Sequence, residues 1–249
     1  MSDMLANIDK AVAMTYDLPP EGIDWKDFNT SVGDVDDPED IPYSSVKEFS
    51  SCIIAYVLGA IFGRWDIRYA TGQKPTPQLP DPFASLAICS PGILQEDDGL
   101  PLSSSSGRKL QAEGLYPLEV AWDGVLVDDS EHPLDLVCHV HSALGVIWGD
   151  RADAIQQEAC ELLGVSKLRE WFRQPVNFFT DHLKRYSKSR RQAPIYWQLS
   201  AGSGSYSAWL YYHRFTQDTL YRVLRDFVEP RIQQAEREQF ELESQGALS

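Results

Sequence analysis

Apolar residues recur at intervals of three and four between positions 46 and 61. They are Val46, Phe49, Ile53, Tyr56, Val57, Ala60 and Ile61. This spacing places them along one side of a helix, so the sequence predicts a well-buried helix over 44–62. Gly63 follows, and glycine is typical of the position just beyond a helix end. We therefore assign 44–66 to one buried helical unit.

Long stretches on both sides of this helix lack such a pattern. Residues 17–50 carry ten acidic and two basic residues, which predicts an acidic, mostly solvated N-terminal segment over 1–43. Residues 72–117 contain seven prolines and the run Ser103–Ser106. A long helix cannot cross so many prolines, so 67–115 is predicted to be a Pro/Ser-rich irregular excursion.

Regular patterning resumes at Tyr116 and continues to residue 230. Two antiparallel hairpins are predicted, 118–122 with 125–128 around Asp123-Gly124, and 195–200 with 206–213 around a Gly/Ser loop. Helices are predicted from Pro133 to Gly149, over 151–163, after Ser166, from Pro175, and from Thr216 or Asp218 onward. The segment 116–230 is therefore an α+β core, and 231–249 is predicted to be a charged helical tail.

Two of these helices have a predicted buried face. The one opened by Pro133 is expected to turn inward Leu134, Val137, Cys138, His141, Leu144 and Trp148. The last one before the tail is expected to turn inward Leu220, Val223, Leu224, Phe227 and Val228. The fold class predicted is α+β, predominantly helical, with two short antiparallel β-hairpins and a long Pro-rich loop.

The composition limits the classes of partner that the chain can bind. With 37 acidic and 22 basic residues the net charge is −15, which argues against a protein that coats nucleic acid over its whole surface. One basic contact patch remains compatible with this balance. The four cysteines match no zinc spacing. No signal peptide is visible. The longest apolar run has about half of the ~20 residues that a membrane span needs, so no span is expected. We expect a cytoplasmic protein with no membrane partner.

A basic cluster stands out against this acidic background. Between residues 182 and 192 there are five basic residues and no acid: Lys184, Arg185, Lys188, Arg190 and Arg191. Tyr196 and Trp197 follow directly, and His213-Arg214 lies at the far end of the second hairpin. Basic groups beside aromatic rings suit a nucleic-acid backbone or a splayed base. The alternatives are that the basic residues complement a helix dipole and that the aromatic rings pack a small core.

No catalytic or cofactor site emerges from the sequence. Methyltransferases that act on adenine use a Gly-rich turn before a helix and an Asn/Asp-Pro-Pro-Tyr/Phe loop. Asp81-Pro82-Phe83 lacks the second proline, and Gly202-Ser203-Gly204 precedes a strand instead of a helix. His139 and His141 point about 200° apart on a helix, so they cannot share a metal ion. We expect no catalytic residue, metal or bound cofactor in this chain.

Several ordered motifs nevertheless carry a family resemblance. They are residues 8–12 with Tyr16 and Leu18, Leu58–Asp66, Pro80–Phe83, Gly124–Asp129 and Ala193–Trp197. Together they resemble the C-terminal region of PglX-like adenine-specific DNA methyltransferases, which belong to BREX phage-defence systems, and of related type IIG restriction–methylation proteins. Asp17 stands where glycine is usual in that family. The resemblance runs along the whole chain.

This resemblance implies a function without catalysis. S-adenosylmethionine is expected only in a methyltransferase domain that this chain lacks, so the chain is expected to be a split or truncated C-terminal part. Its implied role is DNA recognition or scaffolding, with DNA and a methyltransferase subunit or other defence-system proteins as partners. Two alternatives remain: an acidic DNA mimic that inhibits a methyltransferase through 17–50, and an inert gene remnant.

Overall fold

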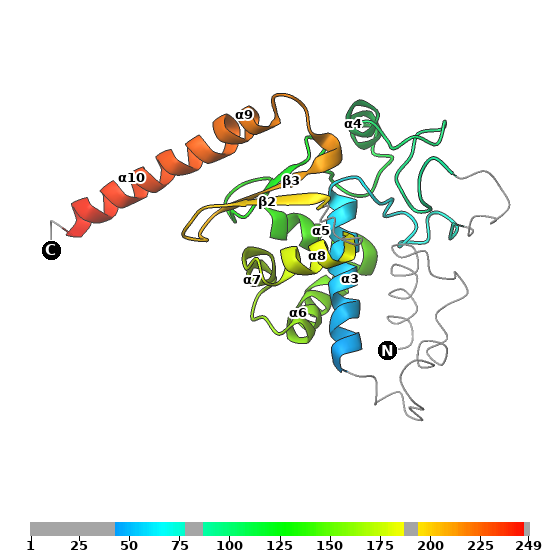
Figure 1. Cartoon of the computed structure of the whole chain (residues 1–249), viewed down its shortest axis with the longest axis horizontal. Helices are drawn as coiled ribbons and strands as arrows, with labels where there is room; N and C mark the ends of the chain where they lie inside the picture. Colours follow the sequence, from blue (N-terminus) through cyan, green and yellow to red (C-terminus); the bar gives the residue numbers. More distant parts are fainter. Residues whose placement is uncertain (1–42, 78–86, 187–193, 247–249) are drawn as a thin grey trace.

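The fold is mostly helical around one small sheet (Figure 1). The computed structural model describes residues 43–77, 87–186 and 194–246. Its main elements are α3 (Tyr43–Ile61), α4 (Ser104–Ala112), β1 (Val125–Val127), α5 (Leu136–Trp148), α6 (Ala152–Leu163), α7 (Leu168–Arg173), α8 (Phe178–Tyr186), β2 (Tyr196–Ser200), β3 (Ser207–Tyr211), α9 (Thr219–Val223) and α10 (Glu229–Gly246). The predicted α+β, predominantly helical class is confirmed.

Helix α3 is the centre of the hydrophobic core. Ile54, Val57, Leu58 and Ile61 are fully buried, and the helix packs against α5, α6 and α8. It ends one residue before the predicted boundary, and Gly63 then adopts a left-handed φ of 68°. This conformation is cheap only for glycine, which explains the stop at this position.

The sheet is antiparallel with the strand order β1-β3-β2. Its central strand β3 is buried at every position because both faces are covered. Trp209 and Tyr211 join the main core, whereas Ala208 and Leu210 form a smaller cluster with Val223 of α9. The sheet therefore lies between the main core, which includes the helices α3 and α5, and the start of the C-terminal helix.

Only the second predicted hairpin forms as predicted. Strands β2 and β3 pair with each other, but residues 118–122 are not a strand. The turn at Asp123-Gly124 exists, with φ of 70° at Gly124. The chain before it instead bonds to the end of α3, where the N–H of Ala121 donates to the carbonyl of Ile61 at 2.8 Å. Strand β1 is thereby left to pair with β3.

The excursion predicted over 67–115 contains the helix α4. Ser103 caps this helix, because its hydroxyl oxygen accepts a hydrogen bond from the N–H of Ser106 at 3.1 Å. A serine run that suggested irregular structure therefore begins a helix, since serine is a strong N-cap residue. Gly107 is buried directly under the ring of Trp122, where a Cβ atom would lie 2.2 Å from it.

The predicted face of α5 is only partly correct. Leu144 and Trp148 are buried and Leu134 and Val137 pack against the core, but Cys138 is exposed. The helix begins after Asp135, whose carboxylate accepts from the N–H of Cys138, instead of at Pro133. His139 is buried and His141 lies toward solvent. Apolar residues surround most of this helix, so the hydrophobic pattern alone could not select the face that meets the core.

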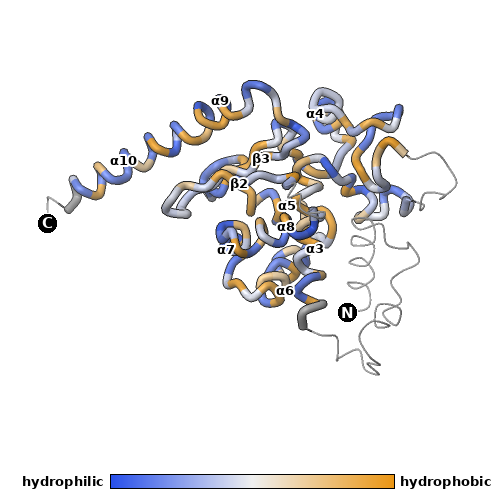
Figure 2. The backbone as a smooth tube through the Cα atoms, in the orientation of Figure 1, coloured by the Kyte–Doolittle hydropathy of each residue, from blue (hydrophilic) through white to orange (hydrophobic). Residues whose placement is uncertain are grey.

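The C-terminal helices extend away from the rest of the chain (Figure 1). Of the predicted inward residues on this part only Val223 is buried, while Leu220 and Leu224 are exposed. The tube of α9 and α10 alternates between hydrophobic and hydrophilic colours (Figure 2). Near its start α10 is tied to the body by Gln234, whose amide donates to Glu131 at 2.7 Å. Throughout the described ranges, we find no helix with both the length and the apolar character to cross a bilayer.

Candidate nucleic-acid interface

The described part of the basic cluster lies on the last turn of α8, and its arginine is used internally. The guanidinium group of Arg185 donates to the carboxylate of Asp181 at 2.7 Å and to the hydroxyl of Ser51 at 2.9 Å. Burial lowers the pKa of Arg185. This residue joins α8 to α3, so it is unavailable to a phosphate. Lys184 is exposed, and Lys188, Arg190 and Arg191 lie outside the described residues.

Tyr196 and Trp197 point to opposite faces of the edge strand β2, as neighbours in a strand must. Tyr196 is only 1% exposed, and its ring stacks on Phe62 with 5.3 Å between centroids. The expectation that Tyr196 offers a surface to nucleic acid is therefore corrected: its ring belongs to the core. Trp197 is 42% exposed and remains accessible.

Arg214 is placed by the short turn that follows β3. Its guanidinium group donates to the carbonyl of Leu102 at 2.8 Å and to the hydroxyl of Ser104 at 3.3 Å. The same group lies 5.5 Å from the ring centroid of Trp122. No carboxylate of the described chain forms an ion pair with Arg214, and its buried Nε has no hydrogen-bond partner there.

Arg64 comes from a distant part of the sequence, directly after the end of α3. Its N–H donates to the carbonyl of Gly59 at 2.8 Å, and its own carbonyl accepts from Leu94 at 3.0 Å. The guanidinium group lies 4.9 Å from the ring centroid of Trp65 and 5.9 Å from that of Tyr186. Within the described ranges Arg64 likewise has no acidic partner, and its buried Nε is without a hydrogen bond.

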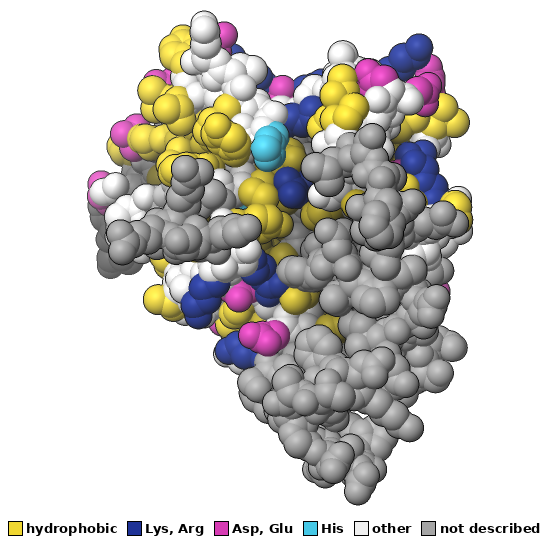
Figure 3. All heavy atoms as spheres, turned by 45° about the vertical axis from the view of Figure 1, so that its right-hand side comes forward, with side chains coloured by type: hydrophobic (Ala, Val, Ile, Leu, Met, Phe, Trp, Pro, Cys, Tyr) yellow, Lys and Arg dark blue, Asp and Glu magenta, His cyan; other side chains and the backbone are white. Residues whose placement is uncertain are grey.

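Arg64 and Arg214 line one hollow of about 430 Å³, which we call the Arg64–Arg214 hollow. Its other lining residues are Gly63, Ile93, Leu100, Pro101, Tyr211 and His213. None of these carries a carboxylate. Figure 3 shows a histidine and several Lys/Arg side chains around a depression on this side of the molecule, among hydrophobic side chains.

The two arginines make this hollow electropositive. The pKa of His213 is lowered by burial and then by the charges of Arg64 and Arg214. The pKa of His182, deeper in the core, is lowered to about 4 by burial and by Arg64. Both histidines therefore respond to positive charge that no nearby acid offsets. Such a field attracts anions, and a guanidinium pair can bind phosphate oxygens with directed hydrogen bonds.

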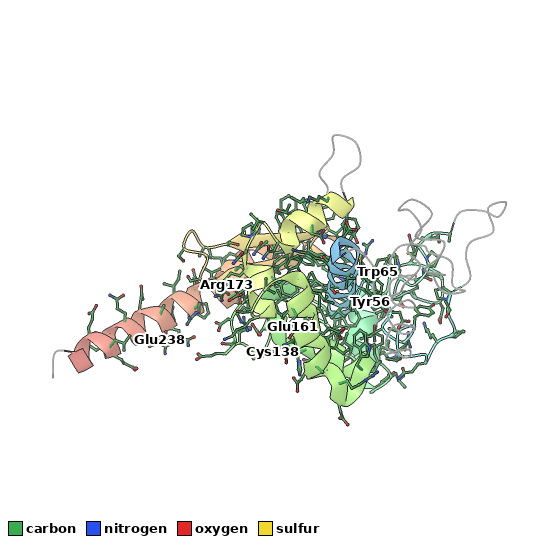
Figure 4. The ribbon with its side chains drawn as sticks, turned by 90° about the horizontal axis from the view of Figure 1, so that it is seen from below. Tyr56, Trp65, Cys138, Glu161, Arg173 and Glu238 are labelled. Atoms are coloured by element: carbon green, nitrogen blue, oxygen red, sulfur yellow. The ribbon has the colours of Figure 1, made fainter. Side chains whose placement is uncertain are left out.

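Several other arginines of the described residues form ion pairs within the chain. Arg169 forms ion pairs with Asp135 at 2.8 Å and with Asp128, and Arg173 reaches Asp128 at 2.6 Å. Arg173 lies on the body, whereas Glu238 lies far out on α10 (Figure 4). The buried carboxylate of Asp66 is held by Arg68 at 2.8 Å.

The structure offers little for metal chemistry. The buried ring of His139 contacts the carbonyl of Pro133 at 3.2 Å, while His141 approaches Asp153 at 3.6 Å on the outer side of α5. Across the part of the chain that the structure describes, no three His, Cys, Asp or Glu side chains gather as metal ligands would. Asp81-Pro82-Phe83 lies outside the described residues, and Gly202-Ser203-Gly204 is the loop between β2 and β3.

Of the two arginines of the hollow, only Arg214 was a candidate site residue from the sequence, and Arg64 was not. Arg64 stood within a motif at a helix end, and its distance along the chain from Arg214 gave no sign that the two converge. Comparison with protein-family models and with curated proteins finds no match for this chain. The site is therefore interpreted from its geometry and from the motifs themselves.

Proposed function

We propose that this chain contacts DNA through the Arg64–Arg214 hollow, as a non-catalytic recognition or scaffolding segment of a phage-defence adenine-methyltransferase system. The observation that carries the proposal is the convergence of two guanidinium groups without acidic partners on one hollow. The methyltransferase context is supported by the resemblance of the Leu58–Asp66 motif, which contains Arg64.

Arg64 and Arg214 differ from several other arginines of the described residues, because they have no acidic partner. Acidic residues outnumber basic ones by 37 to 22, and Arg68, Arg169 and Arg185 each have a carboxylate within 2.8 Å. A partly buried charge without a counter-ion is costly. Two such charges at one hollow are best explained by an anion supplied from outside, and DNA phosphate is the anion that the resemblance suggests.

Fluorescence anisotropy with a labelled duplex tests this proposal. The double variant Arg64→Gln/Arg214→Gln should bind more weakly than the wild type. Its matched control is Lys167→Gln/Arg237→Gln, which removes the same charge from two exposed positions elsewhere and should bind like the wild type. Circular dichroism of each variant checks that it is folded.

A third variant separates the hollow from the basic cluster. Replacing Lys184, Lys188, Arg190 and Arg191 with Gln leaves the structural Arg185 intact. If this variant loses binding while the double variant of the hollow does not, the contact lies on the cluster and our assignment to the hollow is wrong. If the wild type binds no DNA, with or without a methyltransferase subunit, the proposed function fails.

A further inference from the structure

Exposed aromatic rings stand at the edge of the Arg64–Arg214 hollow. The turn Tyr212–Arg214 carries Tyr212, which is 55% exposed, and His213, which lines the hollow. Their ring centroids are 5.4 Å apart, and the ring of Phe215, 40% exposed, lies 5.7 Å from that of Tyr212. A row of exposed rings beside an electropositive hollow is a surface on which a planar group can stack.

The rest of the hollow is largely apolar. Ile93, Leu100 and Pro101 contribute aliphatic surface. They are held in place by backbone bonds from Leu94 to Arg64 at 3.0 Å and from Leu102 to Leu94 at 2.8 Å. A volume of about 430 Å³ falls in the range of small-molecule sites. A phosphate group by itself would leave this apolar surface uncovered.

We propose that the hollow accepts an unpaired nucleotide of a DNA strand. Its phosphate is bound by Arg64 and Arg214, and its base stacks on the ring of Tyr212, with His213 at the edge of the base, and covers the apolar lining. Bases inside a duplex are stacked on each other and cannot reach a protein ring without leaving the helix. Single-stranded or locally opened DNA is therefore expected to bind more tightly than a duplex, of which only the phosphates contact the two arginines. This inference rests on the proposed function that the chain contacts DNA.

Three labelled DNAs of equal length test the inference by anisotropy: a single strand, the same strand with abasic sugars, and the paired duplex. Stacking of one base on an aromatic ring is worth roughly tenfold in affinity. The single strand should therefore bind about tenfold more tightly than the abasic strand. Tyr212→Ala should remove this difference and leave the affinity for the abasic strand unchanged.

Tyr221→Ala is the matched control, because Tyr221 is also an exposed tyrosine, 62% accessible, but lies on α9. It should behave as the wild type does. Equal affinity for the single and abasic strands, or no effect of Tyr212→Ala, would overturn the inference. If all three DNAs bind equally and Arg64→Gln/Arg214→Gln weakens them all, the proposed function stands and only the inference fails. If none of them binds, both fail.

Discussion

The buried imidazole of His182 makes folding stability depend on pH. Its side chain is 1% exposed, and its Nε2 accepts hydrogen bonds from the N–H groups of Ile195 at 2.9 Å and Tyr196 at 3.2 Å. An Nε2 that accepts leaves the proton of the neutral ring on Nδ1. The ring thereby joins α8 to the edge strand β2. Protonation would place a donor against two backbone donors and break this connection.

The size of the effect follows from the pKa of His182. Burial and the charge of Arg64 lower it from 6.5 to about 4. The unfolded chain therefore takes up a proton first as the pH falls, and the native state loses stability between about pH 6.5 and pH 4. Each pKa unit is worth about 1.4 kcal/mol, so the full loss is about 3 kcal/mol, of which about 2 kcal/mol is lost by pH 5.

Urea unfolding at about pH 7.5 and pH 5 measures this loss. In His182→Gln the side-chain oxygen can still accept a hydrogen bond but does not titrate, so we expect its stability to fall by about 2 kcal/mol less than that of the wild type. His141→Gln, on the outer side of α5, should fall as the wild type does. His213, whose pKa is also lowered, contributes equally to all three proteins. The reasoning is refuted if His182→Gln loses as much stability as the wild type.

Three further predictions concern packing, ion pairs and cofactors. Gly59→Ala should lower the free energy of unfolding by about 1–3 kcal/mol, because its Cβ would lie 2.2 Å from Trp65. Gly145→Ala, which has open space around it, should raise it by about 0.5–1 kcal/mol by stabilising α5. The opposite order of stabilities in urea unfolding would contradict this packing. Arg169→Met should lower the free energy of unfolding by about 3 kcal/mol or more in the same assay, since it leaves the buried Asp128 and Asp135 without their shared arginine. The control is Arg173→Met, because the side chain of Arg173 is more exposed. An equal loss of stability in the two variants would show that the ion-pair network of Arg169 is dispensable. Calorimetry should detect no binding of S-adenosylmethionine to this chain, and micromolar binding would overturn the interpretation of its motifs.

Local signals in the sequence predicted the local elements. The period of apolar residues and Gly63 located α3, and Gly164 ends α6 in the left-handed conformation, with φ of 75°. The two segments on either side of the Gly/Ser loop after Pro194 were predicted as strands and form β2 and β3. In each case the decisive residues lie within a few positions of the element, so no tertiary contact is needed to read them.

Predictions that depended on long-range contacts were less accurate. Strand β1 follows a strong turn signal, yet it pairs with β3 because the segment before the turn bonds to the end of α3. The burial of Tyr196 and the internal use of Arg185 depend on where α8 and α3 meet β2. The approach of Arg64 to Arg214 is likewise a product of the tertiary fold. The sequence could supply candidate residues, but it could not show which of them share a surface.

The salt dependence of duplex binding tests the central claim most directly. Each phosphate contact lowers the slope of log affinity against log salt concentration by about 0.9, because condensed counter-ions are released. We predict that Arg64→Gln/Arg214→Gln flattens this slope by at least about one contact relative to the wild type, while Lys167→Gln/Arg237→Gln leaves it unchanged. A slope that is the same in all three proteins would show that the Arg64–Arg214 hollow does not bind DNA phosphate.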